Sequence, residues 1–205
     1  MARTLDFYFD CSSPWTYLAF HAIQPLAAEV GAEIAWKPIL VGGVFNAVNR
    51  TVYENRAHPN PLKQAYMLKD LADWARLYHL SIVFPPKVFP VNAVKCMRGA
   101  LVALDHGRLV PYATAAFEAY WSDDRDISRD DVLADIAAKA GLERQRLFAG
   151  IETEECKARL RSNTDDLIAR GGFGSPTMFV GPSMFFGNDR LPLVKAALLA
   201  EEPAV

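Results

Sequence analysis

Near the start of the chain, a two-residue alternation of side chains gives way to a helical spacing. Residues 5–9 follow a period of two and carry aromatic side chains on both faces, which predicts a strand buried on at least one side. From Trp15 to about Val30 the apolar residues recur at helical spacing, which predicts a helix. Pro14 suits the first turn, since proline has no N–H to lose there. Ser13 is therefore the predicted N-cap, where the strand meets the helix.

The last part of the chain predicts a hairpin and a helix. Two short β-prone runs, Thr177–Val180 and Met184–Phe186, are separated by Gly181-Pro182, and an apolar helical pattern covers Leu191–Leu199. Ser175-Pro176 lies directly before the first run, at a place where a strand tolerates proline. A cis bond there would turn nearby backbone groups toward a ligand, whereas most X-Pro bonds are trans.

Between these parts, roughly from residue 60 to 170, the pattern is helical. The apolar residues of Leu62–Tyr78 are interpreted as one broad face, and the prolines of Phe84–Pro90 interrupt the helices. Ser128 with Asp131 indicates a capping box at one helix start. The other predicted helices are Asn92–His106, Leu109–Trp121, Ser128–Ala140, Arg144–Gly150 and Thr153–Arg170.

The composition is that of a compact enzyme. The chain has 205 residues, 51% hydrophobic and 22% charged, and a formal net charge of −2 without a basic block, which argues against a nucleic-acid partner. Neither a membrane-spanning run nor a secretory signal is predicted. Three cysteines without a close pair favour a reducing compartment. We therefore expect a cytoplasmic protein that does not bind membranes.

Ser13 is the first candidate for chemistry. A helix start has unpaired N–H groups and a partial positive charge that stabilise an anion, although most serines at this position only cap the helix. A disulfide oxidoreductase needs a Cys-x-x-Cys pair, and Ser13 and Thr16 stand at those positions, which excludes dithiol exchange. Cys11 is either a small apolar filler or a single reactive thiol.

Other chemistries lack their characteristic residues. The four histidines are scattered, without a Cys/His set at metal-ligand spacing, and we expect no metal. The Gly-x-Ser-x-Gly motif of serine hydrolases is missing around Ser13 and around Ser175.

Several motifs together resemble one family. They are Asp6-Phe-Tyr-Phe-Asp10, Ser13-Pro14 with Tyr17-Leu18-Ala19, Gly42-Gly-Val-Phe45, Lys63 with Tyr66-Met67, Phe89-Pro90-Val-Asn92, Phe173-Gly174 with Pro176-Thr177, and Gly187-Asn-Asp-Arg190. In this order they resemble the periplasmic disulfide oxidoreductases and, more closely, kappa-class glutathione transferases and 2-hydroxychromene-2-carboxylate isomerases. The resemblance implies an α/β protein with a thioredoxin-like fold and a large all-helical insertion. Residues 1–60 and 171–205 would form the thioredoxin-like domain, and residues 61–170 the insertion.

The resemblance also implies a glutathione site. In it the Ser13 hydroxyl donates to the sulfur of glutathione, whose free thiol has a pKa of about 8.5, and favours the thiolate together with the helix start. The Ser175 main chain before Pro176 pairs with the cysteinyl backbone like an added strand. Asn188 and Asp189 hold the γ-glutamyl group, with helix capping as the alternative for Asp189.

Further ligand contacts are implied in the middle of the chain. Lys63 is assigned to the glycyl carboxylate, with a solvated lysine as the alternative. Asn49 is assigned to the aromatic substrate or to glutathione, and Asn92 to a ligand contact or to helix capping. The aromatic residues assigned to an apolar wall over the substrate, or else to the core, are Trp15, Phe45, Tyr66 and Phe89.

The implied function is that of a glutathione-dependent isomerase of aromatic degradation, which converts 2-hydroxychromene-2-carboxylate to trans-o-hydroxybenzylidenepyruvate. We hypothesise that the thiolate adds to a conjugated carbon, the ring opens, a bond rotates and the thiol leaves. A kappa-class-like transferase acting on small electrophiles would keep the thiol attached. A one-cysteine or non-catalytic thioredoxin-like protein is a further alternative. The resemblance also implies a homodimer.

Overall fold

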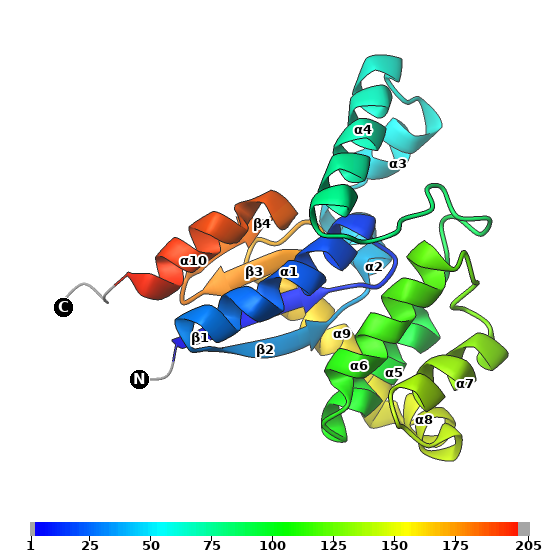
Figure 1. Ribbon diagram of the computed structural model, residues 1–205. Helices are drawn as coiled ribbons and strands as arrows, with labels where there is room; N and C mark the ends of the chain where they lie inside the picture. The colour runs from blue at the N-terminus through cyan, green and yellow to red at the C-terminus, as the bar shows by residue number, and fades with distance from the viewer. Residues whose placement is uncertain (1–2, 201–205) are drawn as a thin grey trace.

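The computed structural model describes residues 3–200, which are built around one four-stranded sheet (Figure 1). Its strands β1 (Arg3–Phe9), β2 (Ala32–Pro38), β3 (Thr177–Val180) and β4 (Ser183–Phe186) lie in the order β2-β1-β3-β4. β1 is parallel to β2 and antiparallel to β3, while β3 and β4 form the predicted hairpin. Both ends of the chain therefore contribute to one sheet.

The strand β2 has no counterpart in the sequence-based prediction. Its sequence, Ala-Glu-Ile-Ala-Trp-Lys-Pro, contains alanine, glutamate, lysine and proline, which are all depleted in strands. Its seven residues pair in register with β1, from Arg3 opposite Ala32 to Phe9 opposite Pro38. Backbone pairing with a strongly β-prone neighbour thus outweighs a weak local preference.

β1 is buried on both faces, as its aromatic residues predict. Leu5, Phe7 and Phe9 are fully buried in the main core beside α1 (Pro14–Val30) and α10 (Leu191–Leu199). Tyr8 faces the other way and packs with Phe179 against Leu167 of α9 (Glu154–Ala169). The sheet is therefore sandwiched between α1 and α10 on one side and α9 on the other (Figure 1).

Helical segments occupy the chain between β2 and β3. They are α2 (Val41–Val48), α3 (Thr51–Ala57), α4 (Pro61–Leu77), α5 (Val94–Asp105), α6 (Leu109–Phe117), a π-helical turn (Glu118–Ser122), α7 (Asp130–Lys139), α8 (Arg144–Ile151) and α9. The helices predicted from periodicity nearly coincide with these segments, whereas α2 and α3 were not predicted. The domain boundaries at residues 60 and 170 stay predictions, and residues 1–2 and 201–205 of those domains lie outside the described chain.

The capping box predicted at Ser128 is wrong. The N-cap of α7 is Arg129, which makes no side-chain capping bond. The Ser128 hydroxyl instead donates to Asp126 Oδ1 at 2.6 Å, and the Ser128 N–H donates to the same oxygen at 2.9 Å. Asp126 therefore forms a local turn with Ser128 that takes the place of the capping box.

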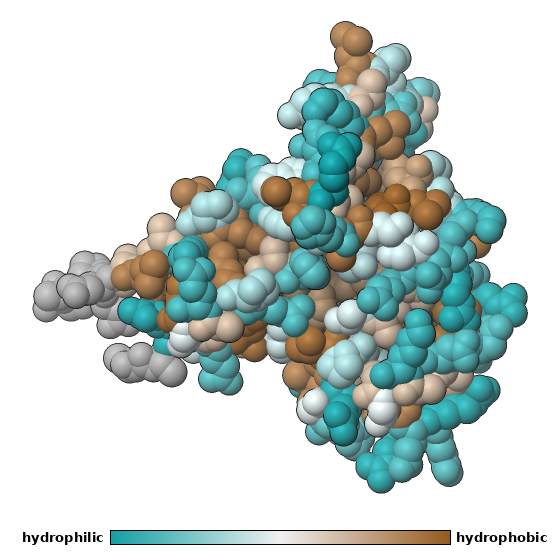
Figure 2. Space-filling model, viewed as in Figure 1, coloured by the Kyte–Doolittle hydropathy of each residue, from teal (hydrophilic) through white to brown (hydrophobic). Residues whose placement is uncertain are grey.

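α3 and α4 project from the body of the molecule as an arm, residues 51–77 (Figure 1). The prediction of one broad apolar face on α4 is wrong. Leu71 and Ala75 are buried against Leu18 of α1, but Leu62 is 82% exposed and Tyr66 is 66% exposed. At about 100° per residue, Leu62 and Tyr66 lie on the side of the helix opposite Leu71. Apolar surface is accordingly visible at the outer end of the arm (Figure 2).

Arg170, which follows α9, ties the helical part to the sheet. Its Nη1 donates to Asp6 Oδ2 at 2.7 Å and to Tyr8 Oη at 2.9 Å. Its guanidinium carbon lies 3.7 Å from the centre of the Phe179 ring. Tyr8 Oη in turn donates to Asp166. Desolvation by burial, followed by the bond to Asp166, raises the pKa of Tyr8 to about 12, so this hydroxyl stays protonated.

We expect Arg170→Met to lower the free energy of unfolding by about 2 kcal/mol, because the partly buried Asp6 carboxylate and the Tyr8 hydroxyl lose their shared partner. Urea unfolding at neutral pH measures the change. Arg146→Met is the control, since the Arg146–Glu143 pair is well exposed and should contribute less than about 0.5 kcal/mol. Equal losses in the two variants would contradict this role of Arg170.

Candidate active site

Ser13 lies between the end of β1 and the start of α1 and is the N-cap of α1, as predicted. Its Oγ accepts from the Thr16 N–H at 3.2 Å and donates to the Ser175 carbonyl oxygen at 3.2 Å. The Ser175-Pro176 peptide bond is cis. The side chain of Ser13 is half-buried. The structure thus brings together the two segments that the sequence placed at opposite ends of the chain.

The Ser175 side chain is a second link between these segments. Its Oγ accepts from the Asp10 N–H at 3.1 Å and shares a hydrogen bond of 2.8 Å with Thr16 Oγ1. Ser175 is 7% exposed and Thr16 is fully buried. The sequence alone indicated only a main-chain role for Ser175, and Thr16 stood out only as the residue in place of a second cysteine. The signal that was available is the i, i+3 spacing of two hydroxyl residues, Ser13 and Thr16, on one helical turn.

Asp10 holds the loop before Ser13 and was also missed as a site residue. Its Oδ1 accepts from the Ser12 N–H at 2.9 Å and from the Ser12 hydroxyl at 2.8 Å, and its Oδ2 accepts from the Val41 N–H at 2.8 Å. Desolvation by burial raises the pKa of Asp10, and the bonds from Ser12 and Val41 oppose that rise. One enclosed carboxylate therefore joins the end of β1, the loop and the start of α2.

Two hydrogen-bond donors beside this junction have no partner within residues 3–200. The first donor is the Trp15 N–H, in the first turn of α1. Of its neighbours, the Ser13 N–H donates to the Asp10 carbonyl oxygen, Pro14 has no N–H, and the Thr16 N–H donates to Ser13 Oγ. The second donor is the buried Nδ2 of Asn188. A buried donor without an acceptor is costly, and an anionic or carbonyl-bearing ligand would satisfy it.

Asn188 and Asp189 form a short 3₁₀ turn, Asn188–Arg190, that packs against α1. Gly187 has a φ of 103°, which favours glycine, and its N–H donates to the Pro176 carbonyl oxygen at 3.1 Å. Asn188 is buried, whereas Asp189 is exposed and pairs with Arg190 at 2.8 Å. The N-cap of α10 is Arg190, without a side-chain bond, so the capping role considered for Asp189 is wrong.

Asn49 and Asn92 both make local hydrogen bonds. Asn49 Nδ2 donates to the Phe173 carbonyl oxygen at 3.0 Å, which places it beside the segment that leads to Ser175. Asn92 is exposed, and its Oδ1 accepts from the Val94 N–H at 3.1 Å. The N-cap of α5 is Ala93, so Asn92 supports the helix start from one residue earlier. The ligand contacts assigned to both asparagines stay predictions.

Lys63 lies in the first turn of α4, at the outer end of the arm (Figure 1). α4 contacts α1 through Leu71, which is about 12 Å farther along the helix axis. The structure therefore does not bring Lys63 next to Ser13, and its assignment to the glycyl carboxylate stays a prediction.

The aromatic wall is only partly assembled. Trp15 packs beside Leu18 and Leu71 at the base of the arm. Phe45 and Phe89 are half-buried, and Arg56 lies over both rings. Tyr66 is largely exposed on the outer half of the arm, and its place in this wall stays a prediction.

Cys11 is fully buried beside Cys96 in the main core. Burial raises the pKa of the Cys11 thiol well above its usual value, and Cys96 adds to the effect. A neutral, enclosed thiol is a poor nucleophile, which supports the interpretation of Cys11 as an apolar filler. Cys96 and Cys156 are also buried, and all three thiols are free.

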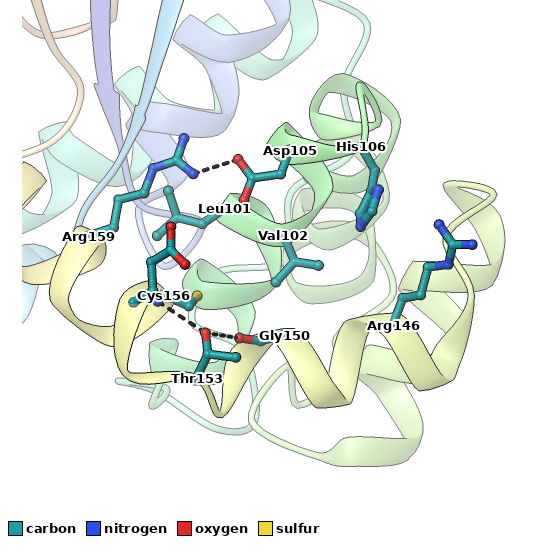
Figure 3. A pocket seen from close by; sticks show the side chains of 10 residues that line it. Leu101, Val102, Asp105, His106, Arg146, Gly150, Thr153, Cys156 and Arg159 are labelled. Carbon is teal, nitrogen blue, oxygen red and sulfur yellow. Dashed lines mark hydrogen bonds and ion pairs between the residues drawn. The ribbon is translucent and has the colours of Figure 1, made fainter.

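A cavity of about 410 Å³ lies away from this junction, between α5, α8 and α9 (Figure 3). Two of its lining arginines already pair with acids, Arg159 with Asp105 at 2.5 Å and Arg146 with Glu143 at 3.1 Å. A second cavity of about 620 Å³ is lined by residues of α7 and α8. Ser13 and Ser175 line neither, so these cavities belong to the helical part.

Two absences concern the described part of the chain. Between residues 3 and 200, no group of three or more His, Cys, Asp or Glu side chains is arranged to hold a metal ion. No helix in that range is both long and apolar enough to cross a membrane.

We expect Asp10→Asn to destabilise the fold by about 1–3 kcal/mol at neutral pH, because an amide cannot accept from both Ser12 and Val41. The raised pKa of Asp10 gives a further expectation. The folded state binds the proton of the Asp10 carboxyl more tightly than the unfolded state does. The free energy of unfolding of wild type therefore falls as pH rises through the raised pKa. Asp10→Asn has no such proton, so its free energy of unfolding lacks this pH dependence. The free energy of unfolding of wild type should therefore exceed that of the variant by more at acidic pH than at neutral pH.

Urea unfolding of both proteins between pH 4 and 7 measures this difference, and the range is an approximate one set by the usual carboxyl pKa. Asp130→Asn, at an exposed carboxylate of α7, is the control. A difference that grows as pH rises would contradict the direction given for Asp10.

Comparison with known proteins gives matches over nearly the whole chain. The sequence profile described as DSBA-like thioredoxin domain matches residues 4–199. The chain is 31% identical over 205 residues to 2-hydroxychromene-2-carboxylate isomerase of Sphingobium xenophagum, an alignment that covers 97% of this chain and all of that protein. It is 26% identical to glutathione S-transferase kappa 1 of Rattus norvegicus, with 98% and 92% covered.

A solved structure of 2-hydroxychromene-2-carboxylate isomerase superposes on this chain with a TM-score of 0.80 at 28% identity. The superposition covers 95% of this chain and 94% of the other. The predicted thioredoxin-like fold with a helical insertion is thereby confirmed.

Proposed function

Because the chain belongs to the DSBA-like thioredoxin domain family, and within it to the family of 2-hydroxychromene-2-carboxylate isomerases, we propose that it isomerises 2-hydroxychromene-2-carboxylate to trans-o-hydroxybenzylidenepyruvate with glutathione as cofactor. The observation that carries the proposal is the junction at Ser13. There the Ser13 hydroxyl donates to the carbonyl of Ser175, and the Trp15 N–H in the first turn of α1 is free. This arrangement suits a thiolate attached to a peptide backbone.

The residues present fit glutathione. The Trp15 N–H and the helix start favour a negative sulfur, and the buried Asn188 Nδ2 is a donor that still lacks an acceptor. The Ser175 main chain would pair with the tripeptide backbone, and Asp189 offers a carboxylate for its amine. Bound glutathione would supply the reversible nucleophile that splits the isomerisation into easier steps.

Ser13 acts by exchanging its hydrogen-bond acceptor. In the free protein its hydroxyl donates to the Ser175 carbonyl oxygen. When a ligand N–H occupies that carbonyl, the Ser13 hydroxyl is released to donate to the sulfur, and it lowers the pKa of the thiol. Asp10, Thr16 and the Ser175 side chain keep the loop in place while this exchange occurs.

We expect Ser13→Ala to lower kcat/KM about 10- to 100-fold, the effect of losing one hydrogen bond to a charged group. The pKa of the bound thiol should rise at the same time, which the ultraviolet absorbance of the thiolate reports. Ser183→Ala, at an exposed serine of β4, is the control. Full activity of wild type without any thiol would refute the mechanism.

The kappa-class relatives support a transferase as a second candidate, since glutathione S-transferase kappa 1 of Rattus norvegicus aligns over 98% of this chain. A transferase releases a product that still carries glutathione, whereas an isomerase returns the thiol unchanged. Mass spectrometry of the product formed from the chromene carboxylate distinguishes the two activities.

We place this reaction in the cytoplasm. The three cysteines are unpaired, which fits a reducing compartment, and such a compartment also contains reduced glutathione.

We further propose that two copies pair through the arm to form a homodimer. No residue of α3 is buried, and Leu62, Tyr66 and Leu68 are all exposed on α4. Short helices are marginal in water unless they bury an apolar face. The next turns of α4 carry two cations, Lys69 and Arg76, and two acids, Asp70 and Asp73. A second copy would cover the apolar side chains, while Lys69 and Arg76 pair with Asp73 within α4.

The double variant Leu62→Asp with Tyr66→Asp tests this interface, because it puts charge into the apolar contact. We expect light scattering to give twice the chain mass of 22.7 kDa for wild type and a single mass for the variant. Leu193→Asp changes an exposed leucine of α10 outside the arm and should leave the dimer intact. A wild type that remains monomeric at high concentration would refute the dimer.

A further inference from the structure

Arg56, in the last turn of α3, is held between two aromatic rings. Its guanidinium carbon lies 5.7 Å from the centre of the Phe45 ring and 5.5 Å from that of the Phe89 ring. The residue is exposed, and no hydrogen bond or ion pair to its guanidinium occurs within residues 3–200. By contrast, Lys87 pairs with Asp124 at 3.1 Å. Arg56 is thus a positioned cation whose hydrogen-bonding edge is free.

Both rings are connected to the loop that carries Ser13. On one side, Asp10 Oδ2 accepts from the Val41 N–H, and Phe45 follows Val41 by four residues on the same face of α2. Arg56 is therefore linked to the loop through the first turns of α2.

On the other side, the Trp121 indole N–H donates to the Cys11 carbonyl oxygen at 2.9 Å. The Trp121 ring stacks on Phe84, with centroids 6.2 Å apart, and Phe84 meets Phe89 edge to face at 5.4 Å. Contacts thus link the two rings that hold Arg56 to Asp10 and Cys11, which lie immediately before the Ser12-Ser13 turn.

We propose that Arg56 binds the carboxylate of an aromatic carboxylate substrate, with Phe45 and Phe89 as the walls beside its ring. The proposal rests on the isomerase function proposed above and adds the residue that recognises the acid. A guanidinium matches a carboxylate with two parallel N–H···O bonds, and the cation–π contacts with both rings restrict its position in advance. Half-buried aromatic side chains with a few placed polar groups are typical of small-molecule sites.

The first test is steady-state kinetics with 2-hydroxychromene-2-carboxylate at saturating glutathione. We expect Arg56→Gln to raise KM about 10- to 100-fold with kcat nearly unchanged, because binding of the acid is lost but the junction at Ser13 is intact. Arg56→Lys should raise KM by less, since it keeps the charge but loses the two parallel bonds.

Arg50→Gln is the matched control. Arg50 lies at the start of the same short helix, bonds only the Asn46 carbonyl oxygen at 3.0 Å, and has no ring beside it. Its loss changes the net charge equally, so KM should stay near the wild-type value. An equal rise of KM in both variants would overturn the proposal in favour of a general electrostatic effect.

The second test measures binding directly, with trans-2-hydroxycinnamate and its amide as probes for the glutathione-loaded protein in a calorimeter. Wild type should prefer the acid, and Arg56→Gln should bind acid and amide alike. Equal binding of the acid and the amide by wild type overturns the proposal. An Arg56→Gln variant with a lower melting temperature but unchanged KM and unchanged preference also overturns it, because Arg56 would then only stabilise the fold. If wild type does not isomerise the chromene at all, the proposed function fails, while the acid and amide comparison still decides the role of Arg56.

Discussion

The contact between Ser175 and the segment from Asp10 to Thr16 is the interaction on which the candidate site depends. The Ser175 carbonyl accepts from Ser13, and its hydroxyl accepts from the Asp10 N–H and bonds Thr16. These residues are 159 or more positions apart in the chain, and most of the atoms involved are enclosed. Hydrogen bonds in such surroundings are strong when complete and costly when one partner is missing. The loop at Ser13 therefore takes its shape from Ser175, two residues before the start of β3.

The surroundings of Cys11 and those of Ser13 have opposite effects on the ionisation of a thiol. Cys11, two residues before Ser13, is sealed in the core, and burial raises its pKa. At the helix start, by contrast, an unpaired N–H and a half-exposed hydroxyl favour an anion. The protein's own thiol is thus kept neutral, while the surroundings of Ser13 suit a thiolate that arrives with a ligand. This contrast distinguishes the site from that of a dithiol oxidoreductase with the same fold.

Much of the local structure was predictable from sequence, because it depends on neighbouring residues. Periodicity predicted α1 and α9, and the serine before a proline predicted the N-cap of α1. β2 was missed because its stability comes from pairing with β1. The face of α4 was misjudged because apolar residues surround that helix, and only the contact with Leu18 selects the buried side.

At the candidate site, the local sequence pattern pointed to Ser13 and Ser175 and the resemblance to a known family supplied their proposed roles, but neither pointed to Asp10, Thr16 or Arg56. These three act through partners that are distant in sequence. Asp10 accepts from Val41, Thr16 bonds Ser175, and Arg56 lies over Phe45 and Phe89. No short motif encodes such contacts, so they became visible only when the tertiary structure placed the partners together.

The pairing of β1 with β3 also has a consequence for the protein during its synthesis. Asp6 lies opposite Phe179, so the sheet closes a loop that includes most of the chain. Closing so long a loop costs entropy, and formation of the intervening helices shortens the gap that has to be closed. While the nascent chain still lacks its last segment, Ser13 has no carbonyl to meet. A ribosome-bound or truncated chain that ends before Ser175 therefore has only half of the junction.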